Sequence, residues 1–176
     1  MSQERRHRNV VNVSEVEPYT LKKGKHHVEG RVLGPRAGNQ QIGATLTTLA
    51  PGAISFPLHF HCANEEAIYV VSGSGTARIG DTRVLVRPGD WIAHPVGPEH
   101  AHQMINDGEE PLVYLCISTT HRAEVVGYPD SKKVGVRAGV DFDQPWIRQI
   151  IRQGESLDYF DGEPNALEAA ASATNT

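Results

Sequence analysis

The stretch Pro51–Gly73, PGAISFPLHFHCANEEAIYVVSG, contains the residue types that decide the fold and chemistry of this chain. His59 and His61 are two residues apart, and residues at that spacing in a β-strand point to the same face. Glu65 and Glu66 follow and begin an apolar run. Two imidazoles and one carboxylate that converge in this way predict three corners of a metal site.

A second stretch, Gly89–Asn106, reads GDWIAHPVGPEHAHQMIN and supplies a further histidine ligand. His100 and His102 are both candidates, and their separation of two residues places them on one face of a strand. We favour His102 because it runs directly into the turn at Asn106, and His100 remains the alternative. His94 is interpreted as a structural or rim residue rather than a ligand.

Length and composition limit the classes of function. The 176 residues, of which 39% are hydrophobic, fit one globular domain. A net charge of −4 gives no overall electrostatic case for binding nucleic acid, and neither a signal peptide nor a membrane span is predicted. Cys62 and Cys116 do not make a disulfide framework, so we expect a cytoplasmic protein.

Short apolar runs separated by glycine and proline turns predict an all-β fold. Gly80-Asp81 has the form of a two-residue hairpin turn. Pro145–Gln153 carries a proline suited to a first helical turn and is predicted to be a short helix. The predicted strands are Gln41–Leu49, Glu66–Val71, Thr76–Ile79, Thr82–Val86, Trp91–His94, Ala101–Ile105, Leu112–Ser118 and Ala123–Gly127.

Both stretches resemble the two motifs of the cupin superfamily, and the resemblance extends over Gln41–Ser118. The first motif departs in one spacing, with six rather than five residues between Gly52 and His59. A two-residue insertion before His102 would reconcile the second. The matching residues are Gly52, His59, His61, Glu66 and Gly73, followed by Gly89, Pro95, Gly97, His100 or His102, and Asn106.

This resemblance implies a small single-domain cupin with a double-stranded β-helix, or jelly-roll barrel, over residues 41–120. Residues 1–40 would form an N-terminal arm that exchanges strands in a homodimer. A short helical or irregular extension over residues 121–160 would pack on the barrel, and residues 161–176 would form a flexible tail.

By the same resemblance, His59, His61, Glu66 and His102 would bind a divalent metal ion, namely Fe, Mn, Ni, Cu, Co or Zn. Glu66 would act as a ligand or as a catalytic base, and Glu65 is the alternative carboxylate, expected to face the other way. The predicted pocket wall takes Ile68 and Val70 from the face of Glu66 and Met104 from the face of His102, with Arg78 and Tyr114 as polar groups.

The sequence is compatible with three functions. The favoured one is a metal-dependent enzyme of dioxygenase, isomerase or lyase type that acts on a small organic molecule. The alternative is a cupin that binds or senses a small molecule without turning it over. The residues before Gln41 lack a convincing helix pair, which disfavours a DNA-binding sensor. A storage role has little support.

Overall fold

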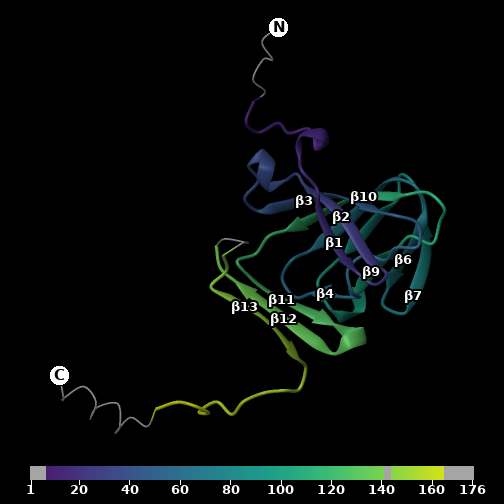
Figure 1. Ribbon diagram of the computed structural model, residues 1–176. Helices are drawn as coiled ribbons and strands as arrows, with labels where there is room; N and C mark the ends of the chain where they lie inside the picture. Colours follow the sequence, from purple (N-terminus) through teal and green to yellow (C-terminus); the bar gives the residue numbers. More distant parts are fainter. Residues whose placement is uncertain (1–6, 141–143, 165–176) are drawn as a thin grey trace.

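A computed structural model describes residues 7–140 and 144–164 of the chain (Figure 1). The described part is built almost wholly from antiparallel strands, and its helices are single 3₁₀ turns. None of these helices is long or apolar enough to cross a membrane. The tail predicted over residues 161–176 lies outside the described residues from 165 onward. The 3₁₀ turns are η1 (Val13–Glu15), η2 (Pro35–Ala37), η3 (Pro98–His100) and η4 (Pro129–Ser131).

The largest sheet has six strands, and its centre is formed by strands far apart in the sequence. These non-local pairings are typical of a jelly roll, in which the sheet is assembled from both halves of the chain. In spatial order the strands are β1 (Tyr19–Lys23), β2 (His26–Val32), β3 (Ile42–Leu49), β10 (Leu112–Thr119), β5 (Glu66–Ser72) and β8 (Trp91–His94).

Two smaller sheets complete the structure, and each carries one residue of the predicted metal site, His102 in β9 and His61 in β4. One has three strands, in the order β7 (Thr82–Val86), β6 (Gly75–Ile79) and β9 (His102–Ile105). The other has four, in the order β13 (Ile147–Arg152), β12 (Lys133–Ala138), β11 (Ala123–Tyr128) and β4 (Phe60–His61). The hairpin predicted at Gly80-Asp81 is confirmed, since Ile79 pairs with Thr82.

The apolar core lies between the sheets. Leu49, Val70 and Leu112 have no exposed surface and come from the three central strands of the large sheet. Each fully buried side chain of this size contributes roughly 1.5–3 kcal/mol relative to exposure. Gly73 follows β5 with φ +76°, and a Cβ there would lie 2.2 Å from the Pro111 carbonyl oxygen, so this position of the first motif admits only glycine.

Two expectations change at the ends of the chain. The helix predicted over Pro145–Gln153 is wrong, because Ile147–Arg152 forms β13 and pairs along its length with β12. Its β-branched isoleucines favour a strand, and hydrogen bonding to the edge strand β12 outweighs the helical spacing of its apolar residues.

At the N-terminal end, β1 and β2 form a hairpin that extends the large sheet through β3, in a region where the sequence predicted no strands.

Candidate metal centre

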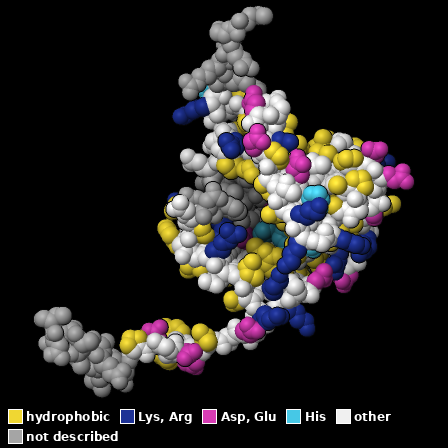
Figure 2. All heavy atoms as spheres, viewed as in Figure 1, with side chains coloured by type: hydrophobic (Ala, Val, Ile, Leu, Met, Phe, Trp, Pro, Cys, Tyr) yellow, Lys and Arg dark blue, Asp and Glu magenta, His cyan; other side chains and the backbone are white. Residues whose placement is uncertain are grey.

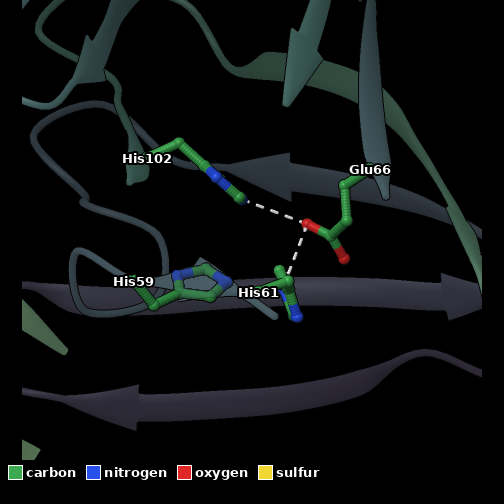
Figure 3. A group of neighbouring side chains, drawn as sticks. All are labelled: His59, His61, Glu66 and His102. Carbon is green, nitrogen blue, oxygen red and sulfur yellow. Dashed lines mark hydrogen bonds and ion pairs between the residues drawn. The ribbon is translucent and has the colours of Figure 1, made fainter. Parts of the chain in front are cut away.

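Four side chains from three segments of the chain converge between the sheets (Figure 3). His59 and His61 come from the segment around β4, Glu66 begins β5, and His102 begins β9. One donor atom from each residue lies within 4.8 Å of all the others. Two backbone hydrogen bonds hold His59 opposite His102, with the His102 N–H donating to the His59 carbonyl at 2.8 Å and the reverse bond at 3.3 Å. The register of the backbone therefore fixes the cluster.

The outer ring nitrogen of each histidine faces an oxygen acceptor. His59 Nδ1 lies 2.8 Å from the Pro57 carbonyl oxygen, and His102 Nδ1 lies 3.1 Å from the His100 carbonyl oxygen. A carbonyl only accepts, so both rings donate from Nδ1, which leaves the Nε2 lone pair of a neutral ring facing inward. His61 Nδ1 faces a carboxylate oxygen of Glu124 at 3.6 Å, and we assign it the same tautomer.

The inward nitrogens meet the carboxylate of Glu66. His102 Nε2 lies 3.1 Å from Glu66 Oε2, and His61 Nε2 lies 3.6 Å from the same oxygen. A neutral His102 would thus direct a lone pair at an acceptor oxygen, so a proton or a cation must lie between them. His61 has no hydrogen bond to either buried ring nitrogen among the described residues. Orphaned buried nitrogens beside a carboxylate are what a bound cation would satisfy.

The pKa values of the clustered side chains are shifted by burial and by their mutual contacts. Burial would raise the pKa of Glu66, but the contacts with His102 and His61 outweigh it and hold that pKa well below its usual range. Burial would lower the pKa of His61, but Glu66 and Glu124 outweigh it and raise that pKa. Burial, followed by the charges of His102 and His61, lowers the pKa of His59 to about 4. An ionised Glu66 and a neutral His59 are the protonation states that metal ligation requires.

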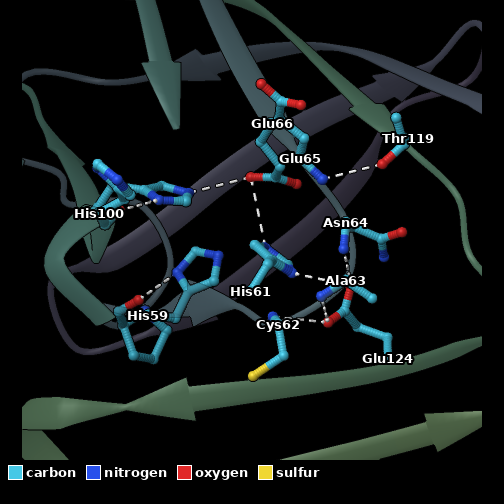
Figure 4. A network of polar contacts seen from close by, with 12 residues as sticks. His59, His61, Cys62, Ala63, Asn64, Glu65, Glu66, His100, Thr119 and Glu124 are labelled. Atoms are coloured by element: carbon cyan, nitrogen blue, oxygen red, sulfur yellow. Dashed lines mark hydrogen bonds and ion pairs between the residues drawn. The ribbon is translucent and has the colours of Figure 1, made fainter. Parts of the chain in front are cut away.

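Glu124 on β11 is the residue of this centre that the sequence analysis missed. Its side chain is 4% exposed, and it accepts backbone N–H bonds from Cys62 and Ala63 at 3.1 Å and from Asn64 at 2.7 Å (Figure 4). These bonds fix the loop that follows His61, and the same carboxylate faces the His61 ring. Sequence spacing gave no signal, because Glu124 lies 62 positions after Cys62 in the chain and is brought beside it only by the pairing of β11 with β4.

His94 is a fourth histidine beside the cluster, and it is buried. It lies opposite Glu66 in the pairing of β5 with β8, and its ring stacks on that of His102 with centroids 3.8 Å apart and an interplanar angle of 17°. It is 2% exposed. Burial and then the charge of His102 lower the pKa of His94 to about 3, so the ring is neutral and packs flat against His102.

The structure places the two alternative ligands outside the cluster. The His100 ring lies 3.6 Å from Glu99 Oε1 at the surface, and its part in the centre is the backbone carbonyl that orients His102. Glu65 is exposed, one residue before the inward-facing Glu66, as expected from strand alternation.

The predicted pocket residues divide between the core and the surface. Ile68, Val70, Met104 and Tyr114 are all at most 3% exposed and belong to one apolar cluster. Arg78 instead binds Asp130 through two bonds of 2.7 and 3.0 Å, which join β6 to η4. Whether any of these five contacts a ligand stays a prediction.

Comparison with known proteins agrees with this architecture. Residues 45–118 match the model of the Cupin domain family. The chain is a small cupin of the cupin superfamily. An uncharacterized protein of Methanocaldococcus jannaschii is 28% identical to this cupin over 103 residues, which cover 58% of this chain and 79% of that protein.

Two solved structures show the range of proteins that share its fold. A putative sugar phosphate isomerase from Acidithiobacillus ferrooxidans is 25% identical with a TM-score of 0.74, covering 86% of this cupin and 96% of that chain. A predicted oxalate decarboxylase from Thermotoga maritima is 25% identical with a TM-score of 0.56, covering 64% of this cupin and 99% of that chain. The similarity to the first structure extends over most of this chain, whereas the similarity to the second extends over about two thirds of it.

Proposed function

We propose that the cupin is a metal-dependent enzyme that holds a divalent ion on His59, His61, Glu66 and His102. The main support is that three imidazole nitrogens converge on the carboxylate of Glu66. Each ring is also oriented by an oxygen acceptor that faces its other nitrogen. Imidazole and carboxylate donors suit Fe, Mn, Ni, Cu, Co or Zn. Such an ion would polarise an oxygen atom of a small substrate.

Among the reactions expected from the sequence, isomerisation of a small oxygen-rich molecule has the most support. It draws on the likeness to the putative sugar phosphate isomerase, which extends over 86% of this chain. The chain's own residues would orient the substrate, and the ionised Glu66 would offset one of the two positive charges of the ion. Dioxygenase and lyase chemistry, the homodimer and the cytoplasmic location stay predictions.

Elemental analysis of protein purified without an affinity tag tests the metal site. We expect the His59→Ala, His61→Ala double variant to lose most of the bound metal and to keep the β-sheet circular dichroism of the wild type. The matched control is His100→Ala, which removes the alternative ligand and should retain the metal. Equal metal content in the double variant and the wild type would refute the assignment.

Activity is tested separately on metal-loaded protein. Interconversion of aldose and ketose phosphates, followed by NMR, is the expected activity, and an oxygen-uptake screen over phenolic, keto-acid and thiol compounds tests the dioxygenase alternative. Full metal occupancy without turnover in either screen would favour the binding or sensing cupin.

A further inference from the structure

The four-stranded sheet directs a row of positive charges to the same side as the metal centre. Glu124 and Tyr128 of β11 both reach the centre, since Glu124 faces His61 and the Tyr128 ring lies 6.2 Å from the His59 ring at 28°. Directly paired residues of an antiparallel sheet point to the same face. The pairing aligns Glu124 with Arg137 and Arg148, and Tyr128 with Lys133 and Arg152. These four basic residues therefore share the inner face.

Tyr128 marks the middle of this basic face. Lys133 Nζ lies 5.2 Å from the centroid of its ring. A Cβ built on Gly135 would lie 3.4 Å from the ring and 3.6 Å from the hydroxyl oxygen, so the ring crosses β12 over this glycine. Gly135 separates Lys133 from Arg137 along the strand, which puts the hydroxyl between the two rows of cations. Burial raises the pKa of the Tyr128 hydroxyl, and the nearby charge of Arg148 partly opposes that rise.

Like charges lie opposite one another on this face, although Arg152 also pairs with Glu155 at 3.7 Å. Arg137 lies directly opposite Arg148, and Lys133 directly opposite Arg152, and like charges in such pairs are destabilising. Within the described ranges, neither Lys133 nor Arg148 has a carboxylate partner. Figure 2 shows lysine or arginine atoms beside histidine and acidic atoms in the hollow of this face.

We propose that Lys133, Arg148 and the Tyr128 hydroxyl bind the phosphate group of a phosphorylated substrate whose other end reaches the metal centre. Two separate cations and a neutral donor match a tetrahedral dianion better than a single carboxylate, which one guanidinium can bind alone. The Tyr128 ring connects this subsite to His59, so a chain of a few carbon atoms spans the two. The inference rests on the proposed metal-dependent function and names its substrate class.

Calorimetric titration of the metal-loaded protein at low salt tests the subsite, with ribose 5-phosphate, inorganic phosphate and ribose as probes. We expect both phosphates to bind and to weaken as salt is raised, because the contacts are ionic. Arg148→Gln and Lys133→Gln should each weaken ribose 5-phosphate binding about tenfold or more, and Tyr128→Phe should weaken it less. Arg148→Lys, which keeps the charge, should restore most of the affinity.

The matched control is Arg83→Gln, an exposed arginine on β7 of a different sheet, which should bind like the wild type. Arg148→Gln should unfold at the same urea concentration as the wild type or a higher one, because it relieves a like-charge pair.

Metal content is measured in every variant. Absent phosphate binding in metal-replete wild type, or equal affinity in Arg148→Gln, overturns the subsite alone, whereas absent metal in the wild type overturns the proposed function. Tighter binding of a matched carboxylate than of the phosphate also overturns the inference.

Discussion

Glu124 offers the sharpest test of how the centre is held, because one buried carboxylate serves both the loop and a ligand. In Glu124→Gln the shape is kept, but one acceptor oxygen becomes an N–H₂ donor. If the amide oxygen keeps the bonds from Cys62 and Ala63, the amide nitrogen meets the Asn64 N–H, donor against donor. An unpaired buried donor costs about 1–3 kcal/mol.

Two measurements follow from this geometry. In urea unfolding of metal-free protein, Glu124→Gln should lose about 2 kcal/mol, which corresponds to roughly 4–8 °C in the melting temperature of a domain of this size. Its affinity for the metal should fall about 10- to 100-fold, because His61 loses the anion that orients its Nδ1–H. Competition against a chelator of known affinity measures the second effect.

Glu65→Gln is the matched control, since Glu65 is exposed and its side chain faces away from the cluster. It should leave both stability and metal affinity unchanged. The reasoning is refuted if Glu124→Gln matches the wild type in both measurements. A loss of stability with full metal affinity would show that Glu124 holds the loop but does not orient His61.

Two further predictions concern the backbone and the pH response. Gly73→Ala should destabilise the protein by clearly more than Gly52→Ala. Both glycines have φ near +75°, but an added Cβ would lie 2.2 Å from a carbonyl oxygen at Gly73 and in open space at Gly52. Urea unfolding of both variants measures the difference, and equal losses of stability would show that the contact at Gly73 relaxes. In metal-free protein, burial and then the charge of His102 lower the pKa of His94 from 6.5 to about 3. As the pH falls below 6.5, the unfolded chain therefore takes up a proton on His94 before the folded protein does, and the free energy of unfolding decreases. His94→Phe keeps the ring stacked on His102 but cannot titrate. Between neutral pH and about pH 5, its free energy of unfolding should therefore fall by about 2 kcal/mol less than that of the wild type. An unchanged pH response would show that His94 takes up its proton without unfolding.

The central strands could be predicted because they are encoded locally. Short runs such as Thr82–Val86 and Leu112–Thr119 are rich in β-branched and apolar residues, and Gly80-Asp81 specifies its own turn. The strands at the two ends depend on partners instead. Ile147–Arg152 has spacing compatible with a helix and became a strand because β12 offered it an edge. The β1–β2 hairpin has a mixed pattern that is resolved only by its pairing with β3.

The sequence by itself determined the candidates for the cluster, His59, His61, Glu66 and His102, with His100 and Glu65 as alternatives, because strand alternation and the motif spacing limit which side chains can share a face. Only the tertiary structure decided how those side chains are oriented and charged. Glu124, the carbonyl of His100 and the ring of His94 act on the cluster through space from other strands. Alternation along one strand is a local property, whereas hydrogen-bond partners and burial depend on segments that only folding brings together.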